Sequence, residues 1–200
     1  MNVFKKLFKQ TFIYGLATVL PRALAIVLVP LYVLVLGKEQ FGVYASLMAF
    51  LILGNVLLSY GMETAFFRFI NKEDYKKEKT QSTALTSLTI STLIFLVLTL
   101  SLKTEMSIFL NFHVDFIIYG LLILALDALV VIPFVWLRTN EKSSRYAIIK
   151  IVNVCINLSF NLFFFLVLPL WAKDTNNSFW DAINLEEGKV AYVFISNLIA

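Results

Sequence analysis

Charge, cysteine and histidine are all scarce in this chain of 200 residues. Only 15% of the residues are Asp, Glu, Lys or Arg, whereas a soluble domain has about 25%. A single Cys excludes an internal disulfide, and a single His excludes a metal site built from several histidines. These shortages argue against a disulfide-stapled secreted domain and against a water-soluble enzyme.

Apolar residues take the place of the missing charges. They make up 60% of the chain, aromatic residues make up 15%, and the mean hydropathy is +0.82. A globule of this size cannot hide such an excess, because it must still cover its surface. The composition therefore predicts an all-α polytopic membrane bundle, and the net charge of +4 is expected to mark cytoplasmic loops rather than a nucleic-acid partner.

Six apolar segments have the composition of membrane spans. A helix needs about 20 apolar residues to cross about 30 Å of hydrocarbon, and the first five segments are long enough to do so. The sixth stops while still apolar, so we expect residues 1–200 to form the amino-terminal six-helix lobe of a longer protein. The predicted spans are Thr11–Leu36, Phe41–Phe67, Gln81–Leu102, Phe116–Leu137, Tyr146–Leu170 and Lys189–Ala200.

The cations alternate between the two sides of this arrangement. Twelve of the 17 Lys and Arg residues lie on the side of the amino terminus, four lie on the other side, and Arg22 lies within the first span. Because cytoplasmic loops carry the excess of Lys and Arg, the amino terminus is predicted to be cytoplasmic. The twelve are Lys5, Lys6, Lys9, Arg68, Lys72, Lys76, Lys77, Lys79, Arg138, Lys142, Arg145 and Lys150.

A few polar residues interrupt the spans, often at helical spacing. Arg22 lies about 16 Å into the first span at 1.5 Å per residue. Since charges within a membrane normally face a partner or a water-filled cavity, aligned polar faces on several helices predict a hydrophilic cavity. Interhelical hydrogen bonding is the simpler alternative for any one of them. The candidate cavity residues are Arg22, Asn55, Ser59, Glu63, Asp127, Lys150, Asn153, Asn157 and Asn161.

Matching depths suggest how the charged members pair. Arg22 and Asp127 both lie near the middle of the membrane, while Glu63 and Lys150 both lie toward the cytoplasm. We therefore predict two ion pairs or near-pairs that line the cavity, Arg22 with Asp127 and Glu63 with Lys150. A strict pair would leave Arg22 neutralised and less suited to bind an anionic substrate.

Three short motifs stand out along the chain. The turn between the first two spans contains Pro30-Leu31-Tyr32, then Gly37 and Phe41-Gly42-Val43-Tyr44. The second span ends in Gly61-Met62-Glu63 leading to Arg68-Phe69, and a basic run extends from Arg138 to Asn157. Together these motifs resemble those of Wzx-type flippases, the polysaccharide-unit exporters of the multidrug/oligosaccharidyl-lipid/polysaccharide superfamily.

This resemblance implies a two-lobed transporter that moves a polyprenyl-pyrophosphate-linked oligosaccharide across the bacterial inner membrane by alternating access. It implies Arg22 as the cation for the pyrophosphate, with Lys150 second, and the Asn153, Asn157 and Asn161 face for sugar hydroxyls. It also implies the polysaccharide polymerase machinery as a partner and no bound cofactor or metal, with H⁺ or Na⁺ as the alternatives for the coupling ion.

Two other functions stay open from the sequence. A drug or organic-cation antiporter of the same superfamily favours an acidic cavity, which Asp127 and Glu63 would supply, although Arg22 argues against it. A membrane-embedded transferase needs clustered carboxylates to hold a metal and a diphosphate, whereas the acids within these spans are isolated.

Overall fold

The computed structural model describes residues 3–71, 76–174 and 188–200, and within these ranges every regular element is a helix. Four helical stretches are long and apolar enough to cross a membrane. The first of them, running from Phe8 to Ile70, folds back on itself and so supplies two of the predicted spans. The all-α polytopic bundle predicted from the composition is confirmed.

Helix α1 (Val3–Ser59) is two helices joined at one glycine. Gly37 has φ 71° and ψ 175°, a backbone conformation that is essentially restricted to glycine. A second break follows at Tyr60 and Gly61, both with positive φ, before α2 (Met62–Ile70) begins. The sequence predicts the hairpin at Gly37, but it predicts one unbroken span over Phe41–Phe67 and misses the second break.

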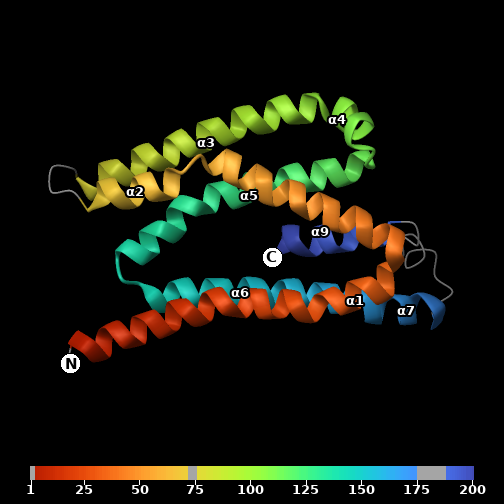
Figure 1. The fold of residues 1–200 in the computed structure, drawn as a ribbon, viewed down its shortest axis with the longest axis horizontal. Helices are drawn as coiled ribbons and strands as arrows, with labels where there is room; N and C mark the ends of the chain where they lie inside the picture. The colour runs from red at the N-terminus through yellow and green to blue at the C-terminus, as the bar shows by residue number, and fades with distance from the viewer. Residues whose placement is uncertain (1–2, 72–75, 175–187) are drawn as a thin grey trace.

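The remaining helices continue the up-and-down path (Figure 1). Helix α3 (Lys77–Ser101) leads to the short α4 (Lys103–Leu110), and α5 (Val114–Thr139) returns through the bundle as the most buried of the long helices. The fifth span consists of α6 (Ser143–Leu162), the π-helical turn η1 (Phe163–Val167) and α7 (Leu168–Asp174), and the last helix is α9 (Lys189–Ile199). The beginning of α1, the end of α2, the beginning of α3 and the α5–α6 turn all lie at one end of the molecule (Figure 1).

A proline explains the π-helical turn within the fifth span. Pro169 has no N–H to donate to the carbonyl of Phe165, and its ring crowds that carbonyl. The backbone widens at this place into the π turn of η1, which is a common response to a break in the ladder of helix hydrogen bonds.

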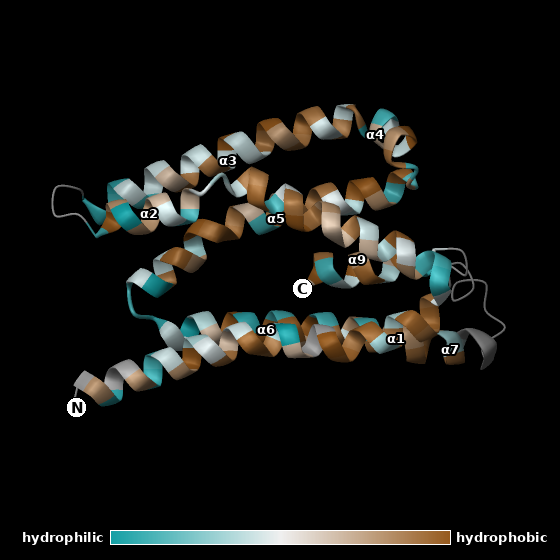
Figure 2. Cartoon of the chain, in the orientation of Figure 1, coloured by the Kyte–Doolittle hydropathy of each residue, from teal (hydrophilic) through white to brown (hydrophobic). Residues whose placement is uncertain are grey.

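Hydropathy follows the membrane geometry (Figure 2). Brown, apolar residues dominate the long helices, and teal residues gather near their ends and turns and also along α6. Many large apolar side chains are exposed, such as Phe8, Leu57 and Val97. Such a surface would promote aggregation in water, but it is suited to contact with lipid chains.

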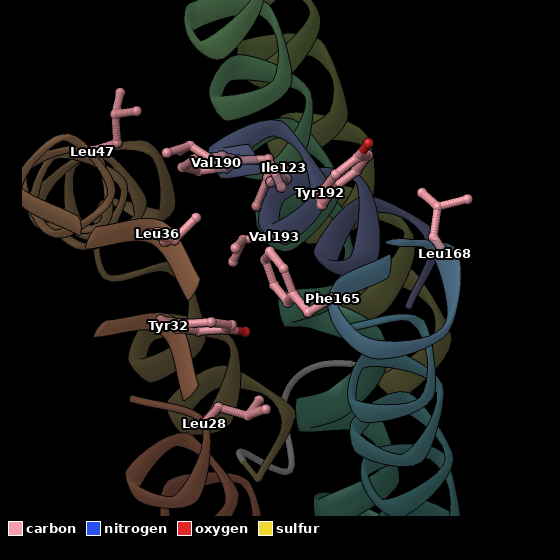
Figure 3. Close-up of a cluster of buried hydrophobic side chains, with 11 residues drawn as sticks. Leu28, Tyr32, Leu36, Leu47, Ile123, Phe165, Leu168, Val190, Tyr192 and Val193 are labelled. Carbon is pink, nitrogen blue, oxygen red and sulfur yellow. The ribbon is translucent and has the colours of Figure 1, made fainter. Parts of the chain in front are cut away.

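The largest core cluster surrounds α9. Val190, Tyr192, Val193 and Phe194 of this helix are at most 3% exposed and pack against side chains of α1, α5 and the fifth span (Figure 3). The ring of Tyr192 stacks on Phe164 with centroids 4.9 Å apart. This packing fixes α9 between the two limbs of α1, and so places its carboxy-terminal end beside α5 and α6.

Candidate functional site

A cavity of about 540 Å³ lies among α5, α6 and α9. Its size falls within the range of about 300–1,000 Å³ that is usual for small-molecule sites. Apolar side chains form much of the wall, and four polar side chains interrupt it. These are Asp127 from α5, Lys150 and Asn153 from α6, and Asn197 from α9.

Asp127 is held by a side chain from the second limb of α1, whereas its predicted partner, Arg22, lies on the first limb. Asn55 on the second limb of α1 donates a hydrogen bond from Nδ2 to Oδ2 of Asp127 over 3.3 Å. Lys150 lines the same cavity but forms no ion pair with this carboxylate. Asn55 and Asp127, both predicted as cavity residues, are therefore brought together.

Lys150 is the cation of this cavity. Its Nζ lies 4.5 Å from the centroid of the Phe134 ring, where the ring quadrupole attracts a positive charge. The side chain is half-buried, and no carboxylate contacts it among the residues that the structure describes. The ammonium thus keeps donors available for an anion that enters the cavity.

A second, smaller cavity of about 200 Å³ adjoins the first, because Asn153 and Asn197 line both. Asn157 of α6 and the rings of Tyr32 and Tyr44 from α1 complete its polar wall. Together the two cavities present three carboxamides, which can each donate and accept hydrogen bonds. We refer to the two adjoining cavities as the polar path.

Asn161, the last member of the predicted asparagine face, does not line this path. It is 0% exposed, and its Oδ1 accepts a hydrogen bond from the Tyr32 hydroxyl over 2.9 Å. Its Nδ2 donates to the backbone oxygen and the Oδ1 of Asn157 over 2.8 and 3.0 Å. Asn161 joins α6 to α1 through the bond from Tyr32. Its hydrogen-bonding atoms are therefore already occupied.

Both predicted ion pairs are wrong. Glu63 of α2 pairs with Arg138 at the end of α5, in a small hollow that these two line together with Thr64 and Phe67. Lys150 and Glu63 do not meet, although their predicted depths are equal. Glu63 lies where α2 contacts the end of α5, whereas Lys150 lines the cavity among α5, α6 and α9. Ser59, one turn before Glu63, bonds only its own helix at the carbonyl of Val56, over 3.2 Å.

Arg22 forms no ion pair with Asp127 among the ion pairs of the described residues. Its side chain is exposed, and it is not among the residues that line the two adjoining cavities, although its neighbour Pro21 lines the smaller one. The structure thus makes Lys150, and not Arg22, the cation that faces the polar path.

Sequence reasoning missed Asn197. It lies in the last apolar segment, Lys189–Ala200. A polar residue inside an apolar run is the same signal that identified Asn55 and Asp127, and it was present at Asn197 as well. Within residues 3–71, 76–174 and 188–200, no group of three or more His, Cys, Asp or Glu side chains is arranged to hold a metal ion.

Comparison with known proteins gives one clear match. The profile of a family described as "Polysaccharide biosynthesis protein" matches residues 7–180, which is most of the chain. Searches of curated proteins and of solved structures returned no match.

Proposed function

The chain belongs to the polysaccharide biosynthesis protein family, and on this premise we propose that it flips a polyprenyl-pyrophosphate-linked oligosaccharide across the bacterial inner membrane. The cargo is a unit of an O-antigen, capsule or exopolysaccharide, and it crosses by alternating access. The chain acts as a multi-pass transporter and not as an enzyme.

One observation carries this proposal: a polar path with a cation at one end runs through an apolar bundle. A polar group inside a membrane is costly unless it meets a partner or water, so several of them around one cavity favour a hydrophilic cargo. Asp127, Lys150, Asn153, Asn157 and Asn197 supply that path.

The proposed role of each residue follows from the chemistry of its side chain. The Lys150 ammonium binds a pyrophosphate oxygen, as a compact point charge suited to phosphate. The carboxamides of Asn153, Asn157 and Asn197 exchange hydrogen bonds with sugar hydroxyls. Asp127, held by Asn55, orients the lysine and is the group that we assign to the coupling ion, H⁺ or Na⁺. Arg22 is the second candidate for the pyrophosphate.

A deletion strain tests the function of the whole protein. Loss of the gene is expected to trap lipid-linked units on the cytoplasmic face and to remove the surface glycan. Normal surface glycan in a strain with no second flippase gene would contradict the proposal.

Matched lysine variants test the site. Lys150→Gln is expected to reduce glycan export at least 10-fold at normal protein levels, because the cavity loses its cation. Lys142→Gln removes one positive charge from the exposed α5–α6 turn and should leave export unchanged. Equal export by the two variants would exclude Lys150 from substrate binding.

The antiporter alternative retains one supporting observation, the carboxylate of Asp127 at the wall of the cavity. An organic-cation antiporter predicts that the protein raises drug resistance and that Asp127→Asn abolishes this resistance. A flippase predicts no change in drug resistance and a defect in glycan export instead.

A further inference from the structure

A pocket of about 600 Å³ lies between α2 and α3, outside the polar path described above. α2 and the beginning of α3 lie together at the end of the molecule that holds the amino terminus (Figure 1), which is the cytoplasmic end by the distribution of cations. The wall of the pocket contains residues of α2 and α3 and none of α6 or α9.

The mouth of this pocket is basic. Lys76, at the residue before α3, and Lys79, in its first turn, both line the pocket and are exposed. The described residues that line the pocket include no carboxylate, although Glu78 lies in the same first turn of α3. The nearest acid on α2 that the structure describes, Glu63, is already paired with Arg138 at a different hollow.

The lining of the pocket changes from lysines to hydroxyl residues along α3. Hydroxyl groups of α3 follow the lysines along one helix face, and apolar side chains of α2 form the opposite wall and the floor. The distance along α3 from Lys76 to Ser87 is about 16 Å at 1.5 Å per residue. The lining hydroxyl residues are Thr80, Thr83 and Ser87, and the apolar ones include Met62, Phe66 and Phe69.

The inner end of the pocket lies beside the break between α1 and α2. The Tyr60 hydroxyl lies 3.3 Å from the hydroxyls of Ser87 and Ser91. Beneath the pocket, Phe66, Ala84 and Leu88 belong to a packed cluster with α5. The pocket is therefore a groove on the outer side of this cluster, with lysines at one end, hydroxyl groups along α3 and apolar side chains along α2.

We propose that this groove binds an anionic phospholipid of the cytoplasmic leaflet. Lys76 and Lys79 hold the headgroup phosphate, the α3 hydroxyls lie at the level of the glycerol esters, and one acyl chain lies along Met62, Phe66 and Phe69. Basic pockets between helices on the cytoplasmic side are a recurring way to bind such headgroups. The site is separate from the cavity of the proposed function and does not depend on the identity of the cargo.

Lipid retention by the purified full-length protein tests the proposal. The protein is reconstituted in nanodiscs that contain equal amounts of phosphatidylglycerol and phosphatidylcholine, released into detergent, and analysed by native mass spectrometry. Wild type is expected to retain phosphatidylglycerol in preference to phosphatidylcholine. The double variant Lys76→Gln, Lys79→Gln should bind phosphatidylglycerol about 30-fold more weakly, since two phosphate-contacting charges are lost.

Two further variants separate a groove from a charged surface. Lys77→Gln with Lys142→Gln removes the same charge from exposed positions that do not line the pocket, and should retain phosphatidylglycerol like wild type. Thr83→Phe keeps every lysine but fills the path of the acyl chain, and this variant should no longer retain phosphatidylglycerol.

Three results would overturn the proposal. Unchanged retention in the Lys76, Lys79 double variant would remove the headgroup site. Unchanged retention by Thr83→Phe would mean surface attraction without a groove. Displacement of phosphatidylglycerol by polyprenyl phosphate at lower concentration would assign the groove to the carrier lipid. None of these measurements involves transport, so the proposed flippase activity stands or fails separately.

Discussion

The hydrogen bond between Tyr32 and Asn161 gives the sharpest test of the packing. Tyr32→Phe removes only the hydroxyl that donates to Asn161 Oδ1 over 2.9 Å. The phenylalanine ring keeps the edge-to-face contacts that Tyr32 makes with Tyr44 and Phe165, at centroid distances of 5.1 and 5.9 Å. The substitution thus isolates a single interhelical hydrogen bond.

The expected cost follows from the burial of the acceptor. Asn161 is 0% exposed, so water cannot replace the lost donor, and an unsatisfied buried group costs about 1–3 kcal/mol. Hydrogen bonds between membrane helices contribute less, about 0.6 kcal/mol on average and about 1.7 at most. We therefore expect Tyr32→Phe to lower the free energy of unfolding by about 1–2 kcal/mol, or Tm by about 3–6 °C.

Unfolding in mixed detergent micelles measures this change. Tyr44→Phe is the matched control, because the Tyr44 hydroxyl makes no hydrogen bond to the part of the chain that the structure describes. Asn161→Leu completes a double-mutant cycle with Tyr32→Phe, for which we expect a coupling energy of about 1 kcal/mol. A coupling energy near zero, or an equal loss of stability in Tyr44→Phe, would refute the reasoning.

Three other predictions concern the helix connections and contacts. Gly37→Ala should lower the free energy of unfolding by about 1–3 kcal/mol, since φ 71° and ψ 175° is strained for any side chain. Gly54→Val should lower Tm measurably, because a Cβ there would come within 2.8 Å of Leu124 Cδ1 and push α1 away from α5. Exchange of the Glu63 and Arg138 side chains should restore most of the stability lost by either single charge reversal, in thermal unfolding at low salt, because the partners contact each other.

A control or a contradicting result is defined for each of these three predictions. Gly42→Val adds the same side chain at a position with no atom within 4 Å of the new Cβ, so it should leave Tm unchanged. A Gly37→Ala protein as stable as wild type would contradict the strain at the hairpin. An exchanged Glu63 and Arg138 pair that is no more stable than the single reversals would show that the contact contributes nothing.

Features that depend on local composition were predictable. The apolar run lengths, the alternation of cations and the hairpin at Gly37 require only the thickness of a bilayer and the freedom of glycine. The break at Tyr60 and Gly61 was missed, because a single glycine inside an apolar run does not reveal a positive φ at its neighbour. The π turn before Pro169 was likewise not predicted.

The candidate site divides along the same line. Asn55, Asp127, Lys150, Asn153 and Asn157 could be selected as polar residues within spans, and the structure places them along or beside one polar path. Their partners could not be deduced from depth, which fixes position along the membrane normal but not the direction in which a side chain points.

The sequence by itself determined that this protein is a helical membrane bundle with most of its cations on the side of the amino terminus. It could do so because hydrophobicity and charge act on each segment separately. The tertiary structure decided which polar groups meet. Arg138 forms an ion pair with Glu63, Asn55 donates a hydrogen bond to Asp127, and Tyr32 donates one to Asn161. These contacts depend on the rotation and close packing of helices that are far apart in the chain, and this is why Lys150 is left as the cation of the polar path.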